Sequence, residues 1–74
     1  MDKRTLNIME VKPGYILRSD SSTLLVLSMD IDEICDPMAF CAVLRCDIFG
    51  GRPVGTAQHV TFGMLPRDRW TMEV

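Results

Sequence analysis

Four residues in the second half of the chain form the strongest candidate for a binding site: Arg52, Arg67, Arg69 and Trp70. Arginine guanidinium groups bind phosphates through paired hydrogen bonds, and an exposed indole ring can stack on a base or on a peptide proline. Arg52 lies in a predicted hairpin, Arg67 precedes a predicted final strand, and Arg69 and Trp70 begin that strand. Such positions often meet at one edge of a small barrel. The alternative interpretation is that Trp70 anchors the core or an interface, while Arg67, Asp68 and Arg69 form surface ion pairs.

The single histidine, His59, is the main candidate for catalysis. A catalytic histidine needs a nucleophile or a second titratable group beside it, and Cys46 on the neighbouring predicted strand could supply one. Arg45 or Arg52 could then stabilise charge that develops on a phosphate. However, the alternation of the strand over 39–49 places Cys46 on the core face, where a thiol packs as a small hydrophobe. A surface or interface histidine without a chemical role is the alternative that we favour.

A run of carboxylates could gather around a divalent cation, because such ions prefer several carboxylate oxygens. The carboxylates are Asp30, Asp32, Glu33 and Asp36. A calcium loop that began at Asp30 would need glycine and glutamate where this chain has Cys35 and Cys41. A solvated acidic loop over 30–36 is therefore favoured. The same loop could instead present acidic charge to the basic surface of a partner, as an inhibitory decoy encoded by a phage or mobile element would.

Motifs for cofactors, metals and membranes are absent from the sequence. The fingerprints GxxxxGK[ST], GxGxxG, GxSxG and HExxH do not occur, and we expect no cofactor. The cysteines Cys35, Cys41 and Cys46 form no CxxC pair, so neither a zinc site nor a disulfide scaffold is expected. No apolar segment is long enough for a signal peptide or a membrane span, which predicts a cytoplasmic protein without a membrane role.

Length and composition indicate one small folded domain. The chain has 74 residues, of which 47% are hydrophobic and 24% are charged. A formal net charge of −2 argues against a protein whose whole surface binds nucleic acid. Because a single core of this size seldom provides more than about 3–5 kcal/mol, some reinforcement is expected.

The pattern of apolar residues and turn residues predicts an all-β protein with about five strands. The strands are expected over 15–19, 23–29, 39–49, 54–62 and 69–74, with a tight turn at Gly50–Pro53 and a single 3₁₀ turn over 64–68. We expect a five-stranded SH3-like barrel or a strongly curved antiparallel sheet over 13–74. Residues 1–12 form an N-terminal segment that is partly flexible or packs on the barrel.

The alternation within two of these strands assigns their faces. Over 39–49 the predicted core face is formed by Phe40, Ala42, Leu44, Cys46 and Ile48. Residues 24–27 are apolar at consecutive positions, which is typical of a strand covered on both faces. In so short a chain the second cover would come from another copy, so the sequence predicts a homodimer.

Residues 14–18 and 24–28, Gly-Tyr-Ile-Leu-Arg and Leu-Leu-Val-Leu-Ser, resemble the opening strands of MazF-like and PemK-like ribonuclease toxins. The resemblance implies an SH3-type barrel that dimerises. The arginine-proline pair that the family carries between these strands is absent, and Arg52-Pro53 lies in a different hairpin, so no residue role is carried over.

The main hypothesis is a small non-enzymatic binding module that recognises a protein or nucleic-acid partner through a barrel edge. One alternative is a MazF-like ribonuclease or other hydrolase that uses His59. The other is the inhibitory decoy that acts through the acidic loop 30–36.

Overall fold

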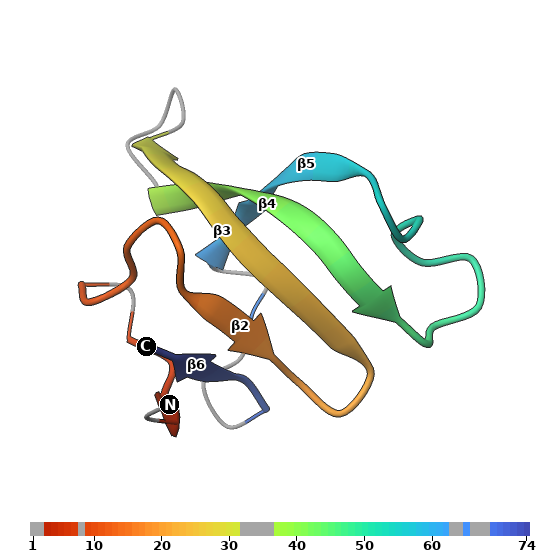
Figure 1. Cartoon of the computed structure of the whole chain (residues 1–74), viewed down its shortest axis with the longest axis horizontal. Helices are drawn as coiled ribbons and strands as arrows, with labels where there is room; N and C mark the ends of the chain where they lie inside the picture. Colours follow the sequence, from red (N-terminus) through yellow and green to blue (C-terminus); the bar gives the residue numbers. More distant parts are fainter. Residues whose placement is uncertain (1–2, 8, 32–36, 63–64, 66–68) are drawn as a thin grey trace.

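The computed structural model describes residues 3–7, 9–31, 37–62, 65 and 69–74, which form a single antiparallel sheet (Figure 1). Its strands are β1 (Lys3–Thr5), β2 (Ile16–Arg18), β3 (Ser22–Ile31), β4 (Pro37–Cys46), β5 (Ala57–Thr61) and β6 (Thr71–Glu73). They follow one another in the order β1-β6-β2-β3-β4-β5. The described residues contain no helix, so the predicted all-β class is confirmed.

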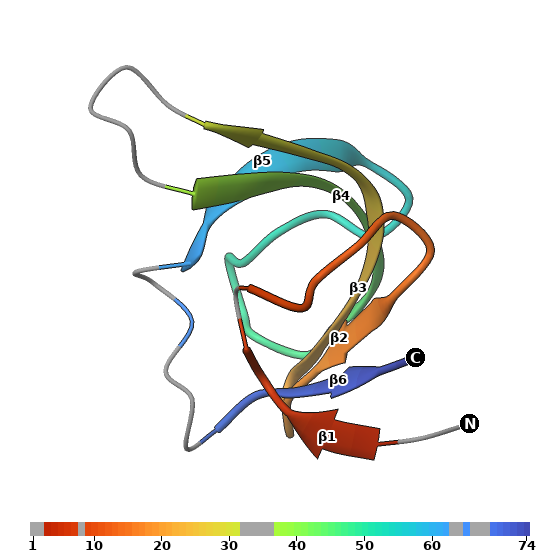
Figure 2. The same ribbon diagram turned by 90° about the vertical axis from the view of Figure 1, so that its left-hand side faces the viewer.

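The sheet curls but does not close. Figure 2 shows β3 and β4 bending so that β5 lies at one end of the curl and β6 and β1 lie at the other. The two edge strands, β1 and β5, do not pair with each other. The closed SH3-like barrel is therefore not found, because the hydrogen-bonded ladder ends at two open edges.

One cause of the curl is a β-bulge at Leu44. Thr23 lies opposite Arg45, and the next residue of β3, Leu24, lies opposite Val43. Leu44 is thus the extra residue of β4, with no residue of β3 opposite it. Such an insertion bends the strand and increases its local twist.

A second bulge lies on the other strand of the same pair, at Leu27. Val26 lies opposite Cys41, and Ser28 lies opposite Phe40. Here the extra residue belongs to β3. The longest strand pair of the sheet is therefore irregular at two points, one on each strand.

Up to the bulge at Leu44, the buried face of β4 is the opposite of the core face that the sequence predicts for 39–49. The buried residues of β4 are Ala39, Cys41 and Val43, and Cys46 packs against the core beyond the bulge. Leu44 and Ile48, predicted to be buried, are 46% and 53% exposed. The bulge is not the cause, because it changes the phase only after Leu44, where Cys46 packs against the core as predicted. Before the bulge, apolar residues occupy both faces of the strand, so alternation alone does not indicate which face is buried.

The apolar run in β3 is covered on one face only. Leu24 and Val26 are fully buried, Leu25 is half-buried and Leu27 is 43% exposed. A single chain thus covers one face of this run and leaves the other open to the second cover that was expected from another copy. The homodimer that was to supply the second cover stays a prediction.

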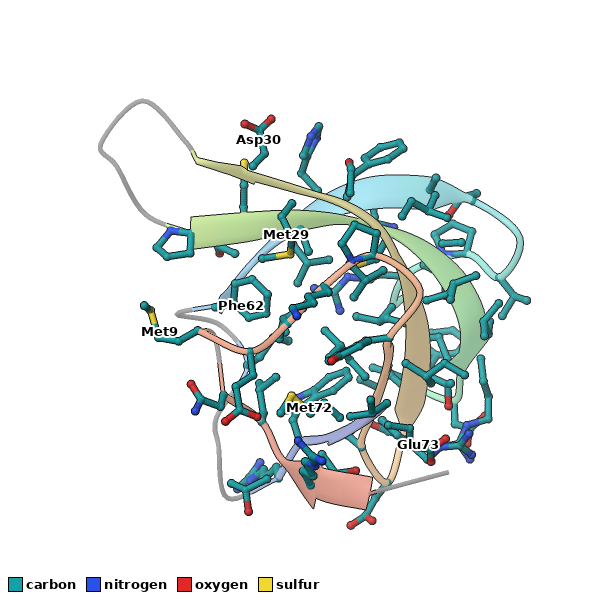
Figure 3. The ribbon with its side chains drawn as sticks, turned by 60° about the vertical axis from the view of Figure 1, so that its left-hand side comes forward. Met9, Met29, Asp30, Phe62, Met72 and Glu73 are labelled. Carbon is teal, nitrogen blue, oxygen red and sulfur yellow. The ribbon has the colours of Figure 1, made fainter. Side chains whose placement is uncertain are left out.

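The core occupies the concave side of the sheet. In Figure 3, Met29, Phe62 and Met72 point into this space, whereas Asp30 points away from it. The buried cluster comprises Leu6, Val11, Leu17, Leu24, Val26, Ala39, Cys41, Val43, Val60, Phe62, Leu65, Trp70 and Met72. Side chains from all parts of the described chain thus share one core.

The N-terminal segment contributes to this domain. β1 pairs with β6, and the N–H of Leu6 donates a hydrogen bond of 3.3 Å to the carbonyl oxygen of Trp70. Leu6 and Val11 are buried. The sixth strand, which the sequence reading did not include, therefore comes from residues 1–12.

The connection from β4 to β5 is longer than predicted and spans residues 47–56. It ends in a turn in which the N–H of Thr56 donates to the carbonyl of Pro53, at 3.3 Å, and Gly55 has a φ of +88°. A positive φ at this position suits glycine. Gly55 and Thr56 both bond to Val43, so this turn leads into a third bulge, and the expected strand start at 54 is replaced by Ala57.

The C-terminal elements agree with the prediction only in part. β6 begins at Thr71 instead of residue 69. The predicted 3₁₀ turn over 64–68 falls largely outside the described residues. Within that range Leu65 is described, and its N–H donates to the carbonyl of Phe62 at 3.1 Å.

A matched pair of leucine substitutions tests which side chains of β3 and β4 lie in the core. Leu24→Ala removes a fully buried side chain and should lower the free energy of unfolding by about 2–5 kcal/mol. Leu44→Ala removes an exposed side chain and should cost less than about 1 kcal/mol. Urea unfolding of both variants measures the difference. Equal losses would contradict the exposed position of Leu44, because they would require Leu44 to be a core residue.

Candidate binding groove

A groove of about 500 Å³ lies where three loop segments meet. One wall is the turn between β2 and β3, a second is the loop after β4, and the third is the segment before β6. Its lining consists of Ser19, Asp20, Ser21, Ser22, Ile48, Arg52, Leu65, Arg69 and Trp70. The groove thus combines arginine guanidinium groups and serine hydroxyls with an apolar base.

The β2–β3 turn is held by its own hydrogen bonds. The N–H of Ser19 donates to the carbonyl of Ser22 at 2.8 Å. The N–H groups of Ser21 and Ser22 donate to the hydroxyl oxygen of Ser19, at 3.4 and 3.2 Å. A serine hydroxyl that accepts from nearby backbone groups stabilises a turn in this way.

The β2–β3 turn is also held by hydrogen bonds from the end of β4 and from the start of the loop that follows it. Arg45 donates from Nη2 to the carbonyl oxygens of Ser19 and Asp20, at 2.9 and 3.0 Å. The N–H of Asp47 donates to the carbonyl oxygen of Ser21 at 2.7 Å. Arg45 also forms an ion pair with Asp47 at 3.3 Å. This wall of the groove is therefore set before any ligand arrives.

Arg52 and Arg69 bring two positive charges to the groove. Arg52 is partly buried and Arg69 is exposed. Ion pairs between described residues involve other arginines, in the pairs Arg4–Glu10, Arg18–Glu73 and Arg45–Asp47. With Asp20 as the one described carboxylate in the lining, the groove carries a net charge of +1 from described residues. Such a surface favours an anionic group, within a chain that is acidic overall.

Trp70 lies in the lining but is only 8% exposed. An indole that stacks on a base needs an open ring face, so this burial supports the core-anchor interpretation of Trp70 over the stacking one. Arg67 lies outside the described residues. The structure therefore brings three of the four predicted site residues together, of which two, Arg52 and Arg69, present charge.

The serine turn is the part of the groove that the sequence reading missed. No site residue is predicted between the expected strands over 15–19 and 23–29. Its position beside Arg52 depends on the length of β3 and on the bulged pairing with β4. Sequence spacing alone carries no signal of that contact.

The predicted catalytic pair is not assembled. His59 lies opposite Phe40, with their ring centroids 4.9 Å apart, whereas Cys46 lies opposite Ser22. Phe40 and Cys46 are six residues apart on β4, which corresponds to about 20 Å along a strand. Arg45 is engaged by the β2–β3 turn. The hairpin therefore separates His59 from both Cys46 and Arg45.

The two described cysteines have opposite environments. The N–H of Ile48, with smaller contributions from Ser22 and Arg52, lowers the pKa of the Cys46 thiol. Burial raises the pKa of Cys41 to about 11, with a smaller opposing effect from Arg52. Since the thiolate is the reactive form, Cys46 is the more nucleophilic of the two.

The described residues give no support for a metal site. They contain no group of three or more histidine, cysteine, aspartate or glutamate side chains that could hold an ion. Asp30 lies at an exposed position of β3, and residues 32–36 of the acidic loop lie outside the described part of the chain. No helix in the described ranges is long and apolar enough to cross a membrane.

Comparison of the chain with protein-family models, with curated proteins and with solved structures found no match. The functional argument therefore depends on the geometry of the groove and of the sheet edges.

Alkylation rates test the two thiol environments. In a Cys35→Ser background, iodoacetamide at pH 8 should modify Cys46 at least about tenfold faster than Cys41, because Cys41 is buried and its pKa is raised to about 11. Peptide mass spectrometry over time measures both rates. Faster modification of Cys41 in the folded protein would contradict the inward position of that side chain.

Proposed function

We propose that the protein is a small non-enzymatic binding module whose groove receives an acidic side chain or segment of a protein partner. The observation that carries the proposal is the convergence of Arg52 and Arg69 on a groove with a hydrogen-bonded serine wall. Guanidinium groups bind carboxylates through paired hydrogen bonds, and the hydroxyl groups of Ser19 and Ser21 can add further donors. The prearranged turn reduces the ordering cost of binding.

A protein partner fits the groove better than a nucleic acid. Proteins that follow a nucleic-acid strand use a basic track along the backbone together with aromatic platforms for the bases. Here the net charge of the chain is −2, Asp20 lies in the groove itself and the indole of Trp70 is buried. One short groove with two described arginines suits a localised carboxylate better than a chain of phosphates.

The alternative functions have less geometric support. The hydrolase hypothesis needs a group that assists His59, and its described ring neighbour is the apolar side chain of Phe40. The decoy hypothesis depends on residues 30–36, most of which lie outside the described residues. Both stay predictions without a structural argument in their favour.

A titration with model peptides tests the acidic-ligand proposal. Hexaglutamate added to the ¹⁵N-labelled protein should shift the amide resonances of Ser19–Ser22, Arg52 and Arg69, whereas hexaglutamine should not. The double variant Arg52→Ala with Arg69→Ala should bind hexaglutamate at least about tenfold more weakly, because two charged hydrogen-bonding groups are lost. Its thermal midpoint should stay nearly unchanged, since neither arginine is paired with a described carboxylate.

Arg4→Ala is the matched control for charge, because it removes an exposed guanidinium outside the groove. It should leave the hexaglutamate affinity within about twofold of the parent protein. Equal weakening by Arg4→Ala and by the groove variant would indicate a nonspecific charge effect and contradict the proposal. Tighter binding of a single-stranded octanucleotide to the same residues would contradict the choice of a protein ligand.

A further inference from the structure

We propose that β5 is a dimerisation strand, which pairs antiparallel with β5 of a second copy about a two-fold axis that passes beside His59. The pairing joins two curled sheets through their open edges. It uses backbone groups and side chains that take no part in the groove.

The backbone of β5 has one set of groups free for such pairing. Val43 is hydrogen-bonded to Gly55 and Thr56, so its N–H and carbonyl groups face the β5 side of β4. Groups of alternate residues along an antiparallel strand face opposite sides. By the register of the β4–β5 pair, Gln58 and Val60 are therefore the residues of β5 that bond to β4.

The backbone groups of Ala57, His59 and Thr61 form the other set. Their N–H and carbonyl groups point away from β4, and no backbone hydrogen bond joins them to another loop within the described ranges. Ala57 and His59 are also exposed as residues. This edge therefore offers three donor and acceptor pairs in a five-residue strand.

Within Ala57–Thr61 the edge at β5 lacks the features that usually prevent pairing, and the bulge at Gly55 and Thr56 lies just before it. Edge strands are commonly protected by charged residues, by proline, by a bulge or by short length. β5 has the sequence Ala-Gln-His-Val-Thr, and its register with β4 is continuous. The opposite edge is different, because β1 has only three residues and two of them are Lys3 and Arg4.

Because the β5 edge is open to pairing and the β1 edge is protected, the strand that pairs with β5 is expected to be β5 of a second copy. In the proposed register His59 lies opposite the same residue of the other chain, and Ala57 lies opposite Thr61 in both halves. Each contact occurs twice, as a two-fold interface requires, and no carboxylate, lysine or arginine is opposed to another. The protected β1 edges then prevent further addition, so the assembly closes as a dimer instead of growing into a fibre.

Sedimentation velocity across a concentration range tests the proposal. The parent protein should sediment at twice the chain mass at high micromolar concentration. The double variant Ala57→Lys with Thr61→Lys places lysine opposite lysine at two points, and it should weaken the dimer by about tenfold or more. Ala57 and Thr61 lie on the face of β5 opposite the buried Val60, so we expect both substitutions to leave the fold intact. Circular dichroism checks that the sheet persists.

A charge-swapped variant makes the test specific for this register. Ala57→Lys with Thr61→Glu places lysine opposite glutamate at the same two points, and it should restore dimerisation to the level of the parent protein or above. Equal behaviour of the Lys/Lys and Lys/Glu variants would overturn the antiparallel register. A parent protein that remains monomeric at millimolar concentration would overturn the dimer itself.

Discussion

The pairing of β3 with β4 is the constraint on which the rest of the structure depends. Each strand leaves one residue unmatched, Leu27 on β3 and Leu44 on β4. Because each bulge bends and twists the strands, the long pair curls and a single sheet can enclose its own core (Figure 2). Each bulge also changes which face the following side chains point to. Met29 and Cys46 therefore pack against the core, whereas both inserted leucines stay exposed. A 74-residue chain with no described helix thereby obtains a concave apolar face covered by its own strands.

The same curl determines where functional surfaces can lie. The pairing of Ser22 with Cys46 places the start of β3 beside the end of β4, so that Arg45 and Asp47 bond to the β2–β3 turn and form one wall of the groove. Because the curl stops before closure, β5 remains an edge strand, and among the described residues none outside β4 forms a backbone hydrogen bond with it. Groove and edge use different residues. Binding of an acidic segment and association of two copies are therefore compatible in one molecule.

The sequence was sufficient for the β class, for the strands expected over 15–19 and 23–29, and for the grouping of Arg52, Arg69 and Trp70. These features depend on local signals, namely short apolar runs, turn residues and the order of elements. The core face of β4 was predicted wrongly. Two alternatives stayed open in the sequence, namely a closed barrel or a curved sheet, and a binding or a core-anchoring role for Trp70. Leucine occurs at buried and at bulged positions alike, so nothing in the residue type at Leu44 marks the point where alternation breaks. The strand in residues 3–5 was missed because three residues carry too little periodicity.

Cross-strand nuclear Overhauser effects between β3 and β4 test the central claim most directly. The bulged register predicts contacts of Ser28 with Phe40 and of Thr23 with Arg45, in addition to the contact of Leu25 with Ala42. A continuous register through Leu25 and Ala42 would instead place Ser28 opposite Ala39 and Thr23 opposite Leu44. Observation of the first set would establish both insertions. Observation of the second set would contradict the bulged pair, and with it the curl, the groove wall and the assignment of the core face.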